Sequence, residues 1–149
     1  GRSGALDAAA AELGWTLVTQ QTAEWNAEKA QQIVQSVIDS GESFNVIYAE
    51  NDDMAKGAVA ALDKANISHG VGKDVIVMGF DCNKWALEEL LKGNWNYDGQ
   101  CNPFQSSYID SVIKDLEAGK TITEKVIIMD EKGFDATTIT QEDVDKYGI

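Results

Sequence analysis

Five side chains in the 149-residue sequence stand where a ligand meets the strand ends of an open α/β sheet. In such sheets, ligands bind beyond the carboxyl ends of the strands, and neighbouring parallel strands lie about 4.8 Å apart. Four of the five residues follow or end segments that are predicted as strands, and the fifth heads the first predicted helix. All five are expected to converge at one edge; they are Arg2, Trp25, Asn51, Asp81 and Gln100.

This combination of side chains is suited to binding a polyol. Two amides, a carboxylate and a guanidinium bind hydroxyl groups as donors and as acceptors, and an indole face covers the apolar C–H face of a sugar ring. No nucleophile and no cluster of metal ligands accompanies them, so no metal and no cofactor is expected. The single histidine, His69, lies in a glycine-flanked loop and is expected to be solvated. A binding protein is therefore predicted rather than an enzyme.

Most of these residues also have a purely structural explanation. Asn51 and Asp81 each precede a predicted helix, where a side-chain oxygen can cap free backbone N–H groups, and Asp52 and Asp53 are also expected to act as capping residues. Trp25 precedes a helix as well, where an apolar residue often forms a hydrophobic staple. What favours the functional interpretation is that the candidate residues are placed together.

Alternating strand and helix patterns position the candidate residues. The run Val75–Met78 is apolar without alternation, which is typical of a strand buried on both faces of a parallel sheet. We therefore predict an α/β fold with a doubly wound, mostly parallel sheet flanked by helices. Predicted helices span residues 3–13, 26–40, 53–66, 84–92, 103–118 and 141–147; predicted strands span residues 15–21, 44–50, 74–81, 94–100 and 123–130, with a loop over 131–139.

Two groups of apolar residues are predicted to be buried. The aromatic residues Trp15, Trp85 and Tyr108 are expected in the core. The predicted helix over residues 103–118 places its apolar residues at 3- and 4-residue spacing on one face, which is expected to point inward. That face consists of Tyr108, Ile109, Val112, Ile113 and Leu116.

Charge and composition exclude some partners and compartments. The formal net charge is −13, which repels phosphate backbones, so no nucleic acid is expected to bind. No run of about 18 apolar residues is present to span a membrane. The chain begins at Gly1 rather than at a methionine, so a processed N-terminus is expected.

The two cysteines are candidates for a disulfide. Cys82 and Cys101 each follow a candidate site residue on strands that are predicted to be neighbours. This places their Cα atoms within the roughly 4.4–6.8 Å that a disulfide requires. Such a bond suits an exported protein, and the alternative is a pair of free, buried thiols.

Five segments resemble the periplasmic or lipid-anchored sugar-binding proteins of bacterial ABC importers, of the ribose- and galactofuranose-binding type. Their order and approximate spacing agree with that family over almost the whole chain. The Asn-Asp-x-Met-Ala-x-Gly and Gly-Phe-Asp elements are specific in combination. The segments are Arg2-Ser3-Gly4, Gln21-Thr22-Ala23-Glu24-Trp25, Tyr48-Ala49-Glu50-Asn51-Asp52-Asp53-Met54-Ala55-Lys56-Gly57, Val77-Met78-Gly79-Phe80-Asp81 and Tyr97-Asp98-Gly99-Gln100.

The resemblance implies a role for each candidate residue. Arg2 is expected to bind ring or anomeric oxygens, Trp25 to stack on the ring, and Asn51 and Asp81 to bind hydroxyl groups. Gln100 is expected near the hinge. The family usually has glycine where this chain has Cys82, and often phenylalanine where it has Trp25.

The resemblance also implies that the chain is the C-terminal lobe of a two-lobed receptor about twice as long. The upstream lobe and the strand before Arg2 are then absent, and residues 102–124 belong to the missing lobe. Apolar surface is expected to be exposed unless that lobe or another chain covers it. The expected partners are a pentose or hexose, also in furanose form, and a membrane permease. The expected location is periplasmic or extracellular, with a lipid anchor in a Gram-positive cell.

Two other functions remain open from the sequence. The effector-binding domain of a LacI-type, sugar-responsive transcription repressor resembles the same fold, but it needs an upstream helix-turn-helix. A phosphorylation switch of the response-regulator type requires an acidic pair after the first strand and a lysine near a late strand end. The chain has no paired acids after residues 15–21 and has Gln100 where that lysine is expected.

Overall fold

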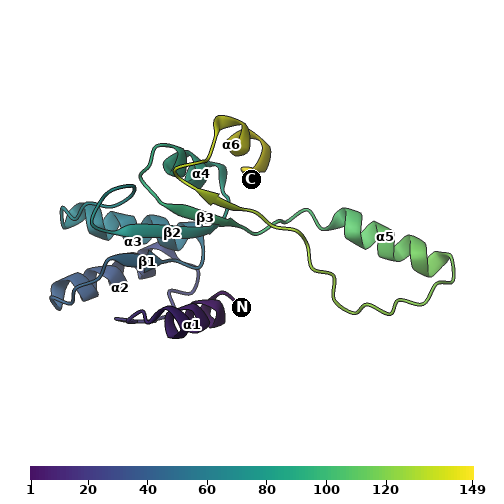
Figure 1. The fold of residues 1–149 in the computed structure, drawn as a ribbon, viewed down its shortest axis with the longest axis horizontal. Helices are drawn as coiled ribbons and strands as arrows, with labels where there is room; N and C mark the ends of the chain where they lie inside the picture. The colour runs from purple at the N-terminus through teal and green to yellow at the C-terminus, as the bar shows by residue number, and fades with distance from the viewer.

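Three parallel strands and one antiparallel strand form the sheet of the computed structural model, which describes residues 1–149 (Figure 1). The strand order is β1-β2-β3-β4, and only β4 runs antiparallel to its neighbour. The strands are β1 (Val46–Tyr48), β2 (Ile76–Asp81), β3 (Tyr97–Gln100) and β4 (Gly133–Asp135). The predicted α/β fold with a mostly parallel sheet is confirmed.

Six helices surround or extend from this sheet. Helices α2 and α3 pack side by side, and α4 contacts both β3 and α6. None of the helices combines the length and the apolar character needed to cross a membrane. The helices are α1 (Arg2–Leu13), α2 (Ala27–Asp39), α3 (Asp52–Lys64), α4 (Lys84–Leu91), α5 (Ser106–Glu117) and α6 (Gln141–Tyr147).

The core lies where β2 meets α3 and α4. Val77 of β2, Leu62 of α3 and Leu87 of α4 are all fully buried in one hydrophobic cluster. Trp95, which precedes β3, is also buried there, and Trp85 packs edge-on against it with ring centroids 5.8 Å apart. This cluster fixes the strands whose carboxyl ends carry the candidate residues.

Two predicted strands are wrong. Residues 15–21 and 123–130 form no strand, because neither segment has a neighbouring strand with which to exchange backbone hydrogen bonds. The fourth strand lies instead in the predicted loop, where Gly133–Asp135 pairs with β3. The predicted helices are present, with their ends moved by at most three residues.

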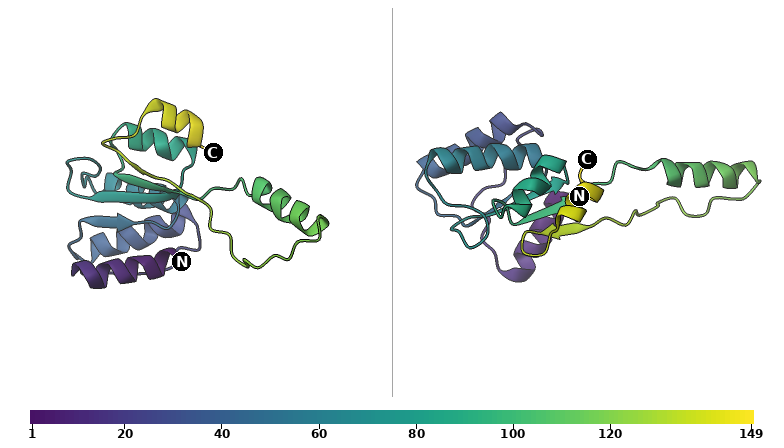
Figure 2. Two further views of the ribbon diagram at one scale, coloured as in Figure 1. Left: turned by 45° about the vertical axis from the view of Figure 1, so that its right-hand side comes forward. Right: turned by 90° about the horizontal axis from the view of Figure 1, so that it is seen from above.

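Part of the predicted core is also wrong. Trp15 is 52% exposed, and Tyr108 is exposed as well, whereas Trp85 is half-buried against the core. Helix α5 contains no buried residue, so its apolar face does not point inward. The physical reason is visible in Figures 1 and 2, where α5 and its flanking segments project away from the sheet as an arm. We call residues 102–131 the arm.

Candidate functional site

The carboxyl ends of β1, β2 and β3 lie at one edge of the sheet, which we call the carboxyl edge. Asp81, the last residue of β2, pairs in register with Gln100, the last residue of β3. Asn51 follows β1 and is the N-cap of α3. Three of the five predicted site residues are therefore held on adjacent elements of the same edge.

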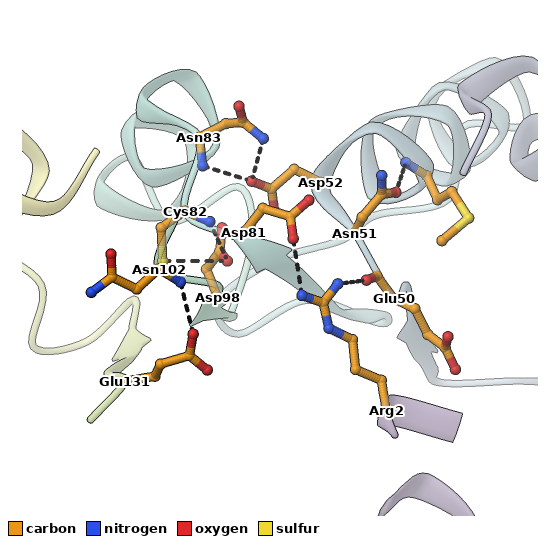
Figure 3. A network of polar contacts seen from close by, with 11 residues as sticks. Arg2, Glu50, Asn51, Asp52, Asp81, Cys82, Asn83, Asp98, Asn102 and Glu131 are labelled. Carbon is orange, nitrogen blue, oxygen red and sulfur yellow. Dashed lines mark hydrogen bonds and ion pairs between the residues drawn. The ribbon is translucent and has the colours of Figure 1, made fainter. Parts of the chain in front are cut away.

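Arg2 reaches this edge from the head of α1. Its guanidinium donates hydrogen bonds to the backbone carbonyl of Glu50 and, at 3.0 Å, to Asp81 Oδ1 (Figure 3). The same guanidinium lies 4.9 Å from the ring centroid of Phe80, within range of a cation–π contact. Arg2 thus connects the ends of β1 and β2 while remaining partly accessible to solvent.

The side-chain amide of Asn51 has an oxygen that caps a helix and an NH2 group that remains available to a ligand. Its Oδ1 accepts a hydrogen bond from the Met54 backbone N–H at 2.9 Å, so the helix-capping interpretation is correct. The capping bond uses the amide oxygen and leaves the amide NH2 as a donor. Capping and ligand binding are therefore compatible at this residue.

Gln100 ties β3 to the chain that returns from the arm. Its backbone N–H donates to the Lys132 carbonyl at 2.7 Å, and its Oε1 accepts from the Lys132 N–H at 3.2 Å. Beside it, the Asn102 N–H donates to Glu131 Oε1 at 2.7 Å. Gln100 thus lies where the arm leaves and re-enters the lobe.

No hydrogen bond, aromatic pair or cation–π contact links the Trp25 side chain to the other four residues. Its side chain is 61% exposed, and its backbone has φ +61°, just before α2 begins. The start of α2 packs closely against α3. The approach is so close that a Cβ on Gly57 would lie 2.0 Å from the Ala27 carbonyl oxygen. Ala27 is the first residue of α2 and Gly57 lies in the first half of α3, so the start of α2 lies beside the half of α3 whose N-cap is Asn51.

The predicted disulfide is not present. Cys82 and Cys101 are both free, with Cys82 buried and Cys101 exposed. The backbone at Cys82 has φ +61°, and its Sγ lies 3.7 Å from Asp98 Oδ1 rather than near the other thiol. A positive φ favours glycine, so the cysteine holds a strained turn directly after Asp81.

Sequence reasoning did not identify two buried aspartates, Asp52 and Asp98, that contact the turn after Asp81. Asp52 Oδ2 accepts hydrogen bonds from the Asn83 N–H at 2.8 Å and from Asn83 Nδ2 at 3.1 Å. Asp98 Oδ1 accepts from the Cys82 N–H at 3.3 Å. Both carboxyl groups are fully buried. In the sequence, Asp98 lies inside a predicted strand beside Gly99, and both aspartates belong to segments that resemble the family.

Burial shifts the pKa values of these groups. Desolvation raises the pKa of Asp98 to about 9, with the charge of Asp52 adding to the effect. Desolvation also raises the pKa of Asp52, to about 6, against the opposing hydrogen bonds from Asn83. Desolvation, followed by the charge of Asp98, raises the pKa of the Cys82 thiol, which therefore stays protonated.

The fold is a mostly parallel α/β sheet with polar side chains gathered at its carboxyl edge. A family profile described as the periplasmic binding protein domain matches residues 2–121. The chain belongs to that family.

Curated and solved relatives agree with this membership. The fructose import binding protein FruE of Bifidobacterium longum is 33% identical over 124 residues, which is 82% of this chain and 36% of that protein. A periplasmic solute-binding protein of Actinobacillus succinogenes with bound D-allose is 27% identical, with a TM-score of 0.76 over 97% of this chain and 48% of that one. The arabinose-binding protein of Shewanella sp. ANA-3 is 20% identical, with a TM-score of 0.81 over 96% and 46%.

These relatives have one class of function in common. They are substrate-binding proteins and not enzymes. FruE is an import binding protein and the other two are binding proteins of ABC transporters, which does not favour the repressor alternative. The chain spans less than half of the length of each of them.

Proposed function

We propose that this chain is one lobe of the solute-binding component of an ABC sugar importer and binds a monosaccharide by hinge closure. The observation that carries the proposal is the meeting of Arg2, Asn51, Asp81 and Gln100 at the carboxyl edge. They offer both donors and acceptors to vicinal hydroxyl groups without a nucleophile or a metal cluster. Relatives with bound D-allose and L-arabinofuranose support a pentose or hexose as the ligand.

The arm supports the existence of a second lobe. Ile109 and Ile113 of α5 are exposed, and Ile128 on the returning segment is 87% exposed. Apolar surface of this extent is normally covered in a soluble protein. We propose that residues 102–124 pack into an upstream lobe, so that the lobe described here comprises the rest of residues 1–149.

The place where the arm joins the lobe is the proposed hinge. Only two chain crossings connect them, next to Gln100 and Lys132, and a hydrogen bond from Asn102 to Glu131 links the crossings. Rotation at a few residues of this kind closes two lobes around a ligand. The closed form would then dock on a membrane permease, and the protein would act outside the cytoplasm.

Calorimetric titration of the full-length protein with pentoses and hexoses, including furanose forms, tests the proposal. At least one sugar is expected to bind with one site per chain. Asp81→Asn is expected to weaken binding by about tenfold or more, because a hydrogen bond to a charged group contributes about 1.5–3 kcal/mol. Asp53→Asn, which neutralises an exposed carboxylate two residues beyond Asn51, is the matched control.

Trp25 is tested separately, because no hydrogen bond or aromatic contact links its exposed side chain to the other four residues. Trp25→Ala is expected to weaken sugar binding, whereas Trp15→Ala, which removes a similarly exposed tryptophan, should leave it within about twofold. Equal effects of the two variants would remove Trp25 from the site. Absence of binding to every sugar in the panel would overturn the proposed function.

A further inference from the structure

The turn that follows Asp81 is strained and depends on two buried carboxyl groups. Asp81 has φ +117° and Cys82 has φ +61°, both in the region that disfavours side chains. The backbone N–H groups of the next two residues, Cys82 and Asn83, point to Asp98 and Asp52 (Figure 3). One carboxyl comes from β3 and the other from the first turn of α3, so the turn is held from two sides.

The two carboxyl groups each have one oxygen that the chain leaves without a partner. These atoms are Asp52 Oδ1 and Asp98 Oδ2, and both are buried. Their partnered oxygens, Asp98 Oδ1 and Asp52 Oδ2, accept from the N–H groups of the consecutive residues Cys82 and Asn83, so the two carboxyl groups are close neighbours. Asp52 Oδ1 sits above Gly79, where a Cβ would approach it to 2.7 Å, so this oxygen has little room to turn away.

Two ionised carboxylates offer only acceptors to each other, whereas one proton between them satisfies both orphaned oxygens. We propose that Asp52 and Asp98 share a proton that fixes the turn Asp81–Asn83 and thereby positions Asp81 for sugar. The positioning of Asp81 for sugar rests on the proposed function, whereas the shared proton does not. Asp98 is a positioning residue, since it contacts the turn and not the ligand edge.

The surroundings of the pair retain the proton on Asp98. Burial and the neighbouring Asp52 charge raise the pKa of Asp98 to about 9, so that its proton is lost to solvent only in alkaline solution. Cys82 faces the pair with a neutral thiol, and Asp81 adds a negative charge that Arg2 partly offsets. At the N-cap of α4, the uncharged Asn83 faces the pair and donates to Asp52.

An amide NMR titration of the full-length protein without sugar tests the shared proton. The Cys82 and Asn83 N–H signals are expected to shift together with a midpoint near pH 9 in the wild type. Asp98→Asn supplies a permanent N–H donor to Asp52 and keeps an acceptor for Cys82, so this shift should disappear. Loss of the infrared band of a protonated carboxylic acid over the same range gives a second readout that needs no variant.

Sugar affinity at about pH 7 and about pH 10 tests the positioning role. The wild type is expected to lose affinity by about tenfold between the two values, whereas the Asp98→Asn ratio should stay within about twofold. Asp53→Asn, which removes an exposed carboxylate, should behave as the wild type does. Equal ratios for wild type and Asp98→Asn would overturn the positioning role.

The remaining outcomes separate the two proposals. Two results would overturn the proposal of a shared proton. One is the same amide shifts in Asp98→Asn as in the wild type, and the other is no shift near pH 9 in the wild type. Failure of every variant and of the wild type to bind any sugar would overturn the proposed function, while the amide titration would still decide the inference about the turn.

Discussion

The guanidinium of Arg2 donates to Asp81 Oδ1 at 3.0 Å and joins the head of α1 to the end of β2. The pair is about three-quarters buried on both sides, so it is less screened than a surface ion pair. It presents the remaining N–H donors and the second carboxylate oxygen as one polar unit. A sugar hydroxyl that replaced a water here would meet a preformed donor and acceptor.

A double-mutant cycle tests whether Arg2 and Asp81 act as this unit. Arg2→Lys and Asp81→Asn should each weaken sugar binding, because lysine lacks the planar fork that reaches both Glu50 and Asp81. The double variant should lose less than the sum, with a coupling energy of about 0.5–3 kcal/mol from calorimetric affinities. Additive losses would show that the two side chains contact the ligand independently.

The carboxyl ends of β2 and β3 could be predicted from the sequence because local patterns determine them. The apolar run Val75–Met78 identified β2, and the polar residues after each strand then marked the carboxyl edge. Residues 15–21 have a strand-like pattern but form no strand, because a strand also needs a neighbour, and the sequence pattern of one segment carries no information about that.

The buried pair could not be predicted for a related reason. Asp52 lies in the first turn of α3, and its position in the sequence predicts a role at that helix start. In the structure its carboxylate instead accepts from Asn83, the N-cap residue of α4. Asp98 becomes part of the site only through the pairing of β3 with β2. The amphipathic pattern of α5 likewise predicts that one face will be covered, without indicating by what.

Helix packing next to the site depends on Gly57. A Cβ at this position would lie 2.0 Å from the Ala27 carbonyl oxygen and 2.7 Å from its carbon, which are backbone atoms that cannot rotate away. Gly57→Ala is expected to destabilise the protein by about 1–3 kcal/mol in urea unfolding, because α2 must move off α3.

The matched control is Gly4→Ala in α1, where a Cβ would meet nothing within 4 Å. This change should be neutral or stabilising by up to about 1 kcal/mol, since alanine is the better helix former. A Gly57→Ala variant as stable as the Gly4→Ala variant would contradict the close approach of α2 to α3.

The buried carboxyl pair predicts how stability depends on pH. The folded pKa of Asp98, about 9, lies above that of an unfolded aspartate, so the folded state binds more protons between the two values. The stabilisation is complete below about pH 4 and is lost as the pH rises towards about 9, with a slope of up to about 1.4 kcal/mol per pH unit.

Urea unfolding at a series of pH values measures this loss. The wild type is expected to become steadily less stable relative to Asp98→Asn across the window, because the asparagine has no proton to retain. A difference between the two proteins that stayed constant from about pH 5 to about pH 9 would show that the folded Asp98 is ionised throughout.

Polar substitutions on the apolar face of α5 should lower the stability of the full-length protein but reduce the self-association of the 149-residue chain. Ile109 and Ile113 are 55% and 47% exposed here. If an upstream lobe covers them, Ile109→Ser/Ile113→Ser should destabilise the full-length protein, by about 1.5–3 kcal/mol for each fully buried side chain. In the 149-residue chain the same change should reduce self-association in sedimentation, because it removes exposed apolar surface. Glu117→Ser, at an exposed polar position of the same helix, should do neither. Unchanged stability of the full-length double variant would mean that the arm is not an element of a second lobe.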